Sequence, residues 1–296
     1  YFFSRNSTSY LWKTTTQGNI NSIAISADGD YIVAGSSYTS SPNTGRLYLF
    51  GKDSSTAIWT YSINSKQIPS VSISADGQYI VAVYAPHGEN SGDGIIYVFS
   101  KDSSTPLWSY TVTGEVKSVA ISADGEYIVT GSYGDKVYLF DKDSSTPVWT
   151  SGDLGDDIKS VSISADGEYI AAGGLGSSNG KVYLFDKDSS TPVWSYTVGS
   201  DVYTVSISED GEYIAAGSEN KKLYLFDKDS STPIWNYAGD SEFTEVALSA
   251  DGKYIASAHN HHTALHENNL ASRPSLITYG PRSGNEPTLP VSLQWF

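Results

Sequence analysis

A unit of roughly 44 residues is repeated six times along this chain of 296 residues, and a period of that length is typical of repeat architectures. Each copy contains one Asp-Gly pair, and the copies lie at Asp28-Gly29, Asp76-Gly77, Asp124-Gly125, Asp166-Gly167, Asp210-Gly211 and Asp251-Gly252. Each copy also has a tryptophan at one position, at Trp12, Trp59, Trp108, Trp149, Trp194 and Trp235. A single unit of this size cannot bury its own apolar face, so the copies must pack on one another.

The short-range pattern within one copy predicts four strands. Val161–Ser164 alternates apolar and small polar residues, whereas Tyr169–Ala172 and Val182–Phe185 are β-branched or aromatic runs bounded by Gly, Asp and Ser. The intervening Ser-Ala-Asp-Gly suits a tight hairpin, and Pro192–Tyr196 supplies the fourth strand. Because the third strand is apolar at every position, both faces of each sheet must be covered. Radially packed four-stranded blades provide that cover, so the sequence predicts an all-β propeller.

The repeat resembles two propeller families. SVAISADGEYIVTGS, residues 118–132, resembles the opening strands of tryptophan-aspartate repeat propellers. VYLFDKDSSTPVWSY, residues 182–196, is similar to the repeat of pyrroloquinoline-quinone dehydrogenase-type propellers, although it has Thr-Pro where that family has Thr-Gly. The resemblance covers residues 1 to 258 and is typical of archaeal and bacterial surface proteins. It implies a fold rather than a quinone enzyme, and no cofactor is expected.

The two ends of the chain decide the number of blades. Tyr1–Trp12 aligns with YLFDKDSSTPVW, so the chain starts at the third strand of a blade. Beyond Ala258 the consensus is lost, but the interval from Tyr254 to Pro274 equals that from Tyr213 to Pro233, and residues 275–280 fall where a fourth strand is due. We therefore predict one domain, residues 1–296, with a divergent segment at 259–296.

The preferred arrangement has seven blades, the seventh being incomplete and closed by the N-terminal strands pairing with Val291–Phe296. The alternative is a ring of six blades in which residues 1–14 complete the blade that begins at Thr244–Ala258. That arrangement leaves the C-terminal segment outside the ring.

Charge and composition exclude several classes of function. The chain has 18 Lys and Arg against 33 Asp and Glu, a formal net charge of -15, and its lysines are scattered through turns. A nucleic-acid backbone or an anionic membrane requires clustered positive charge, so neither partner is expected. Cys is absent, which excludes disulfides and thiol chemistry. Abundant Ser, Thr, Tyr and Gly with only 17% charged residues favours an extracellular or cell-surface protein.

Function is expected on the loops that differ between copies. The turns between the first and second strands and between the third and fourth strands are nearly constant, whereas the loops between the second and third strands, and those between successive blades, vary in length and character. Binding residues commonly lie on such loops held by a rigid scaffold. The candidate contact residues on this variable face are Tyr38, Tyr84, His87, Tyr133, Asp156, Asp157, Tyr203 and Phe243.

Three smaller patterns suggest further sites. Four of the five histidines, His259, His261, His262 and His266, lie close together in the divergent segment and could bind a transition metal or zinc. Asn6-Ser7-Thr8 matches the acceptor pattern for N-glycosylation at Asn6. The repeated Asp-Lys-Asp-Ser-Ser of residues 141–145, 186–190 and 227–231 has carboxylate spacing like a calcium loop, but capping of a turn explains it better.

These observations predict a non-enzymatic scaffold that binds a protein partner or assembles with itself. The repeated aromatic residues occur once per blade, as packing requires, and the first strands of the blades carry no catalytic constellation. A lectin-like carbohydrate-binding propeller is an alternative that depends on the tyrosines of the loops. A propeller enzyme with an unidentified site is the other alternative.

Overall fold

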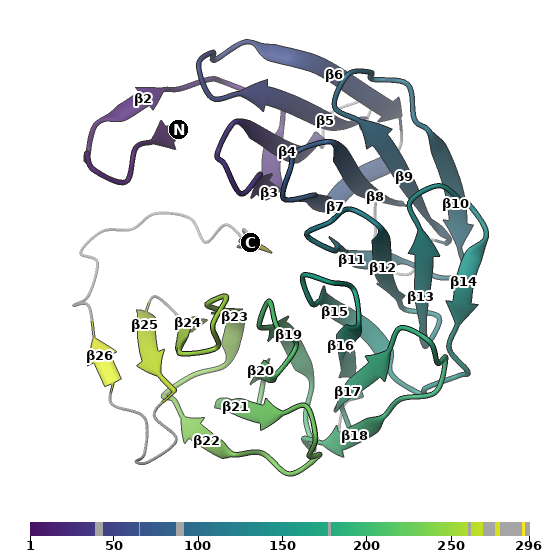
Figure 1. Ribbon diagram of the computed structural model, residues 1–296, viewed down its shortest axis with the longest axis vertical. Coiled ribbons are helices and arrows are strands. Elements are labelled where there is room, and N and C mark those ends of the chain that lie inside the picture. The colour runs from purple at the N-terminus through teal and green to yellow at the C-terminus, as the bar shows by residue number, and fades with distance from the viewer. Residues whose placement is uncertain are drawn as a thin grey trace.

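The computed structural model describes residues 1–38, 44–64, 66–86, 92–176, 179–259, 262–268, 276–278 and 292–293. Over these ranges all regular elements are strands, and no helix suited to crossing a membrane is found among them. Six sheets, each with four consecutive antiparallel strands, stand as blades around a central axis (Figure 1). The predicted all-β propeller is confirmed.

The first strand of each blade, its inner strand, lies nearest the axis, and the fourth is its outer strand (Figure 1). Blades 1 and 2 contain β3 (Asn19–Ile25), β4 (Tyr31–Tyr38), β5 (Thr44–Gly51), β6 (Ala57–Asn64), and β7 (Lys66–Ile73), β8 (Tyr79–Pro86), β9 (Gly94–Ser100), β10 (Trp108–Val112). Blades 3 and 4 contain β11 (Val116–Ile121), β12 (Tyr127–Ser132), β13 (Lys136–Asp141), β14 (Pro147–Thr150), and β15 (Asp157–Ile163), β16 (Tyr169–Leu175), β17 (Lys181–Asp186), β18 (Trp194–Thr197). Blades 5 and 6 contain β19 (Val202–Ile207), β20 (Tyr213–Ser218), β21 (Lys222–Asp227), β22 (Trp235–Ala238), and β23 (Phe243–Leu248), β24 (Tyr254–His259), β25 (His262–Glu267), β26 (Leu276–Thr278).

The divergent C-terminal segment supplies two strands of blade 6. β25 pairs with β24 and β26 pairs with β25, so residues 276–278 form the outer strand that the repeated spacing predicted. The six-bladed alternative is wrong, because the N-terminal residues take no part in the sheet of blade 6.

The two chain ends fill part of a seventh position in the ring. β1 (Phe2–Phe3) and β2 (Tyr10–Trp12) form a two-stranded sheet, the terminal hairpin, next to blade 1 (Figure 1). β27 (Ser292–Leu293) runs parallel to β3 as a fifth strand of the blade 1 sheet. The predicted partner of the C-terminal strand is therefore corrected from the N-terminal strands to β3. An inner strand has an unpaired edge toward the axis, and β27 pairs with that edge.

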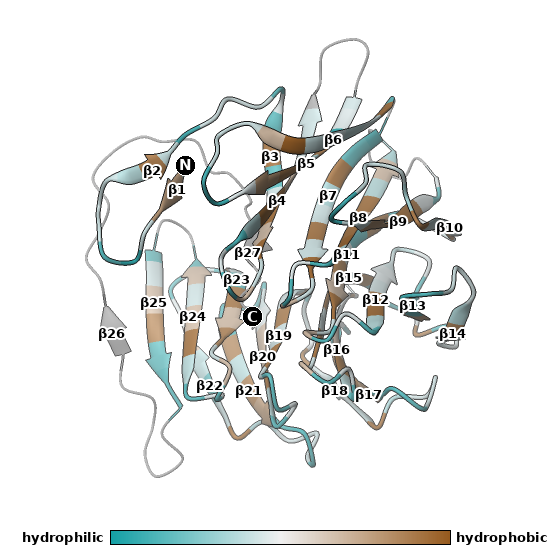
Figure 2. Cartoon of the chain, turned by 45° about the horizontal axis from the view of Figure 1, so that its top comes forward, coloured by the Kyte–Doolittle hydropathy of each residue, from teal (hydrophilic) through white to brown (hydrophobic). Residues whose placement is uncertain are grey.

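The hydrophobic core lies between blades rather than within them. In blade 3 the third strand is buried on both faces, with Val137, Leu139 and Phe140 at 0% exposure. The apolar clusters combine residues of consecutive blades, as where Val81 and Val83 of blade 2 pack with Val119 of blade 3. Figure 2 shows hydrophobic residues along the strands and hydrophilic residues in many of the turns. Because burying such a side chain stabilises by about 1.5–3 kcal/mol, the stacked blades hold one another in place.

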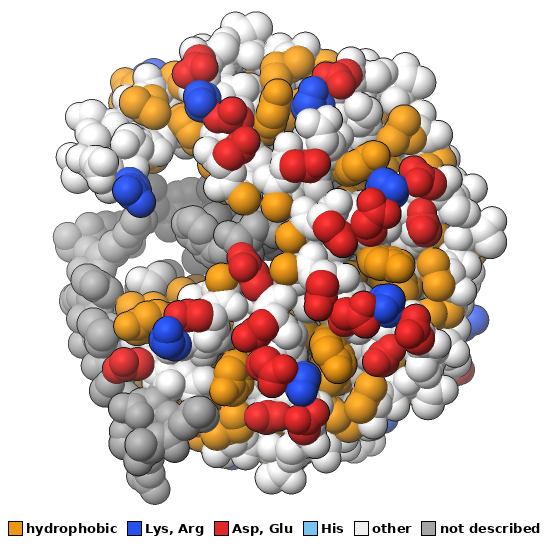
Figure 3. Space-filling view, viewed as in Figure 1, with side chains coloured by type: hydrophobic (Ala, Val, Ile, Leu, Met, Phe, Trp, Pro, Cys, Tyr) orange, Lys and Arg blue, Asp and Glu red, His pale blue; other side chains and the backbone are white. Residues whose placement is uncertain are grey.

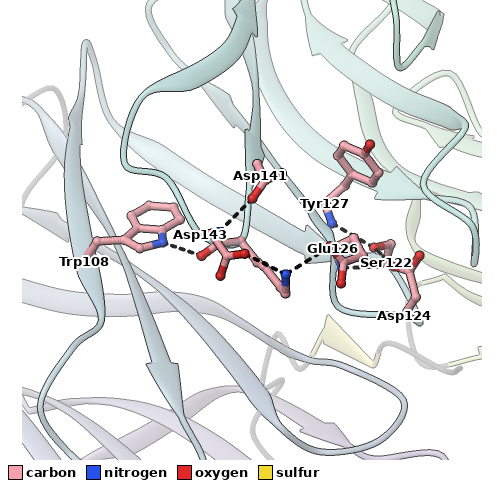
Figure 4. A network of polar contacts seen from close by, with 8 residues as sticks. Trp108, Ser122, Asp124, Glu126, Tyr127, Asp141 and Asp143 are labelled. Carbon is pink, nitrogen blue, oxygen red and sulfur yellow. Dashed lines mark hydrogen bonds and ion pairs between the residues drawn. The ribbon is translucent and has the colours of Figure 1, made fainter.

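Tryptophans on outer strands join neighbouring blades. Trp108 of blade 2 packs on Phe140 of blade 3 with ring centroids 5.5 Å apart, and its Nε1–H donates to the carbonyl of Lys142 over 2.6 Å. Figure 4 shows this indole reaching the turn of the next blade, where Glu126 and Asp143 pair with the Lys142 ammonium. Trp12 makes the same contacts with Phe50 and the carbonyl of Lys52 in blade 1. The terminal hairpin therefore stands where the third and outer strands of a seventh blade belong.

The Asp-Gly turns have one geometry in every blade. In blade 3 the Ser122 hydroxyl donates to Asp124, which also accepts the amide of Glu126 over 3.0 Å (Figure 4). Gly125 adopts a φ of +78°, a conformation that favours glycine. In the third-to-outer-strand turns the Asp141 carboxylate accepts the Asp143 amide over 2.8 Å, as the capping interpretation predicted.

The disc has two different faces. The turn face carries the first-to-second and third-to-outer turns, which the Lys142–Glu126 ion pair joins at 3.0 Å. Figure 3 shows one face with acidic side chains distributed around the ring and fewer lysines among them, as these repeated turns require. The loop face carries the other two kinds of connection, which meet where the Leu154 amide donates to the Asp135 carbonyl over 3.0 Å.

Candidate binding site at the mouth of the central channel

Every inner strand is interrupted by a β-bulge at the same position of the repeat. In β11, for example, Val116 pairs with Ser132 and Ser118 with Gly131, so Lys117 is an extra residue without a partner on β12. A bulge turns one side chain away from the regular alternation of the strand. The six residues at this position are Asn21, Pro69, Lys117, Lys159, Tyr203 and Thr244.

All six bulge residues line one cavity of about 460 Å³ along the axis of the ring. The bulges lie near the start of the inner strands, so the residues surround the end of this channel that opens toward the loop face. Ligand sites commonly occupy cavities of roughly 300–1,000 Å³. Most of these side chains differ in charge and size. The lining of the channel mouth therefore varies around the ring even though the blades are similar.

The residue after each bulge fixes the inner strands relative to one another. The Val161 amide of β15 donates to the Ser118 hydroxyl of β11 over 3.1 Å, and the Val205 amide of β19 donates to Ser160 over 3.0 Å. Equivalent bonds join the remaining consecutive inner strands from β3 to β23. These bonds hold the bulge residues at a defined spacing around the channel.

Charged groups gather where blades 3, 4 and 5 meet at the channel mouth. Lys117 pairs with Glu115 over 2.6 Å and lies 5.6 Å from the centroid of the Tyr133 ring. Burial raises the pKa of Tyr133, and the neighbouring carboxylates of Glu115 and Asp157 raise it further. Burial also raises the pKa of Asp157, helped by the nearby acids.

Two half-buried groups in the channel itself have shifted pKa values. Burial lowers the pKa of the Lys159 ammonium, and repulsion from Lys117 lowers it further. Burial raises the pKa of Glu245 to about 8, although its hydrogen bond with Thr204 acts in the opposite direction. The carboxyl of Glu245 therefore takes up a proton at a higher pH than an ordinary glutamate does.

Three of the predicted contact residues lie together at this mouth. Tyr133, Asp157 and Tyr203 are partly exposed, and Tyr203 lines the cavity directly. The side chain of Tyr38 and the whole of His87 lie outside the described residues.

The prediction is wrong for Tyr84, Phe243 and Asp156, which are buried. Tyr84 and Phe243 are 0% exposed: Tyr84 packs against Tyr61 and Tyr97, and Phe243 occupies the apolar position that precedes the bulge. Asp156 is 3% exposed and accepts the Tyr183 hydroxyl over 2.6 Å, which makes it a structural residue. The lectin alternative loses Tyr84 as a possible stacking residue.

Metal binding by the four histidines stays a prediction, and the three that are described have different surroundings. His266 is fully buried at the position where other blades have phenylalanine, and it pairs with the Ser257 hydroxyl over 3.0 Å. His259 lies 2.9 Å from Asp240, whereas His262 is 3.9 Å from the same carboxylate. No group of three or more potential ligands is found within the described ranges, and His261 lies outside them. Asn6 is exposed in the terminal hairpin, and its glycosylation stays a prediction.

Sequence analysis missed the three charged residues of the channel. Lys117, Lys159 and Glu245 were passed over because the inner strands are nearly interchangeable in sequence. The signal for the two lysines is that one inner-strand position changes its chemical type from blade to blade. The signal for Glu245 is that it replaces the Ser or Thr found at the next position in the other five blades.

Comparisons with known proteins agree with this fold. The family model of outer membrane protein assembly factor BamB matches residues 43–271, and the model of the WD domain, G-beta repeat, matches residues 9–40. The β-propeller domain of Cps50 (Swd1) from Myceliophteria thermophila superimposes with a TM-score of 0.72 at 15% identity, covering 95% of this chain and 90% of that one. None of the curated protein sequences matches significantly.

Proposed function

Because the chain belongs to the family of the outer membrane protein assembly factor BamB, we propose that it is a non-enzymatic binding scaffold of the cell envelope or cell exterior. Propellers of the BamB and WD types generally mediate protein–protein interactions. The chain would contact a protein partner with its loop face, around the mouth of the central channel.

The distribution of individual residues supports the choice of face. The turn face repeats the same Ser-Ala-Asp-Gly and Asp-Lys-Asp-Ser-Ser turns in most blades. The channel mouth, in contrast, has a different residue at nearly every bulge, and Tyr133, Asp157 and Tyr203 stand beside it. A surface that recognises one partner needs residues that differ from blade to blade, whereas turns that only connect strands can be the same in every blade.

The envelope location is supported by the family and by composition. The family is named for the assembly of outer membrane proteins, and the chain is rich in Ser, Thr, Tyr and Gly with few charged residues. Fractionation of the native cells tests this part of the proposal. Recovery of the protein in the cytosolic fraction alone would contradict it.

Photo-crosslinking from both faces tests the binding surface. A crosslinking amino acid replaces one exposed residue at a time, Thr113 or Glu242 on the loop face and Asp102 or Asp229 on the turn face. In native cells we expect discrete crosslinked products from the loop-face positions and none from the matched turn-face positions. Products from the turn face alone, or equally from both faces, would contradict the proposal.

A further inference from the structure

Two ammonium groups stand side by side at the channel mouth. Lys117 and Lys159 occupy the same bulge position of adjacent inner strands, β11 and β15, and both line the cavity. Their proximity is evident in the pKa of Lys159, which Lys117 helps to lower. A chain of net charge -15 therefore concentrates positive charge at one point inside the ring.

Only one of these ammonium groups has a counter-charge in contact. Lys117 pairs with Glu115, which is 6% exposed and thus held in place. Lys159 forms no ion pair within the described part of the chain. Of the two described acids that line the cavity, Glu245 forms no ion pair and has a raised pKa, and Glu209 lies in the Asp-Gly turn of blade 5 at the opposite end of the channel. Lys159 therefore lacks a contacting counter-charge, and Glu115 acts on it only from a distance.

The other polar groups around the two lysines can donate hydrogen bonds. The hydroxyl oxygens of Ser118 and Ser160 accept amides of the next inner strands and still carry a proton each. Tyr203, on the following strand, adds a phenol to the lining. Ammonium and hydroxyl donors around one point form an environment that favours an anion.

From this arrangement we propose that the channel mouth binds a single carboxylate between Lys159 and Lys117, with the Ser118 and Ser160 hydroxyls as additional donors. This inference rests on the proposed function, because the carboxylate would belong to an acidic side chain that a protein partner inserts into the channel. A free small carboxylate has the same chemistry and is the other source.

The surrounding charges favour a monovalent group over a dianion. One carboxylate pairs with the Lys159 ammonium, whereas Asp157 and Glu115 beside the mouth repel any further negative charge. Inorganic phosphate should therefore bind more weakly than a monocarboxylate.

The test uses the whole chain with ¹³Cε-labelled lysine and three probes. The probes are propionate, inorganic phosphate, and an end-capped peptide Lys-Gly-Glu-Gly-Lys with its Gln counterpart. The NMR signal of Lys159 is assigned by its loss in Lys159→Gln. Lys221→Gln removes an exposed lysine from the same face that does not line the cavity, and it serves as the matched control.

We expect the Glu peptide to shift the Lys159 signal saturably and to bind at least tenfold more tightly than the Gln peptide. Lys159→Gln should abolish this difference, whereas Lys221→Gln and Lys159→Arg should keep most of it. A response to propionate but not to the Glu peptide would identify the free carboxylate as the source. An unshifted Lys159 signal with all probes, or tighter binding of phosphate than of propionate, would overturn the inference.

One further measurement distinguishes a folding defect from a loss of binding. A second distinguishes failure of the carboxylate site from failure of the proposed binding face. Circular dichroism and the thermal midpoint show whether Lys159→Gln is folded. If it is not, Lys159→Arg, which keeps the positive charge, is compared with the wild type instead. If no probe shifts the Lys159 signal but the wild type gives loop-face crosslinks, the carboxylate inference fails while the proposed function stands. If the wild type gives no loop-face crosslinks, the proposed function fails instead.

Discussion

The indole N–H of Trp149 in blade 3 donates to the main-chain carbonyl of Lys187 in blade 4 over 2.6 Å. The equivalent indoles of Trp12, Trp59, Trp108 and Trp194 make the same bond to the following blade, at 2.6 to 2.7 Å. Trp235 of blade 5 is the exception, because its buried Nε1–H has no partner among the described residues. The contact between blades is therefore regular up to the divergent segment and incomplete there.

This difference predicts unequal effects of one substitution. Trp149→Phe removes the indole and its hydrogen bond, whereas Trp235→Phe removes an indole of the same shape whose N–H has no bond to lose. We expect Trp149→Phe to lower the free energy of unfolding by about 1 kcal/mol more than Trp235→Phe. Urea denaturation of both variants measures the difference, and equal losses would show that the bond between blades contributes nothing.

Replacing the glycine of an Asp-Gly turn should destabilise the chain more where that glycine packs against the preceding blade, as Gly167 does, than at Gly29. Gly167 has a φ of +74°, and an added Cβ would lie 2.5 Å from Cδ2 of Tyr127 in the preceding blade. Gly29 has a φ of +76°, but its nearest neighbour would be 4.0 Å away. Gly29→Ala should cost about 1–2 kcal/mol from backbone strain alone, and Gly167→Ala should cost clearly more.

Thermal unfolding of the two alanine variants provides the comparison. Tyr127→Ala combined with Gly167→Ala removes the steric contact, so the double variant should lose less than the sum of the single changes. Strict additivity would argue against the clash between blades.

Glu245 should make stability depend on pH between about 4.5 and 8. Its pKa is raised from the model-compound value of 4.5 to about 8 in the folded chain, so over this range the folded state binds more protons than the unfolded state. Stability must then fall as pH rises, by at most about 1.4 kcal/mol per pH unit from this group. Denaturation midpoints across this range should fall less steeply for Glu245→Gln than for the wild type, and parallel curves would contradict the prediction.

Restoring the repeat residues in blade 6 should stabilise the chain. His266 occupies the phenylalanine position, with a buried Nδ1 that has no partner among the described residues and a pKa lowered to about 4 by burial. Because its folded pKa is depressed, its contribution is lost as pH falls from 6.5 toward 4. Ser257, its only hydrogen-bond partner in the part of the chain that the structure describes, stands where Ala172 lies in blade 4.

The double variant His266→Phe with Ser257→Ala removes both polar groups at once. We expect a gain of about 1–3 kcal/mol and reduced loss of stability between pH 6.5 and 4. His266→Phe alone is the control, and it should gain less because it leaves the Ser257 hydroxyl buried without its partner. A double variant that is less stable than the single one would show that this position differs from the other blades.

The fold was largely predictable because the repeat carries redundant information. Alternating Val161–Ser164 and the uniformly apolar Val182–Phe185 indicate strands and a sheet covered on both faces, and every copy indicates the same. Aligning the copies would also have shown that Phe243 and Tyr84 occupy buried positions. Judging each of these residues only by its place near a variable loop led to the wrong assignment of both as contact residues.

Sequence alone determined the strands, the blades and the aromatic contacts between them, because these depend on local periodicity and on neighbours that resemble each other. Tertiary structure decided which residues face the axis, where β27 pairs, and that His266 is a core residue. A bulge changes the direction of one side chain without leaving a regular pattern in the sequence. Lys117 and Lys159 become neighbours only when six such bulges are placed around one channel.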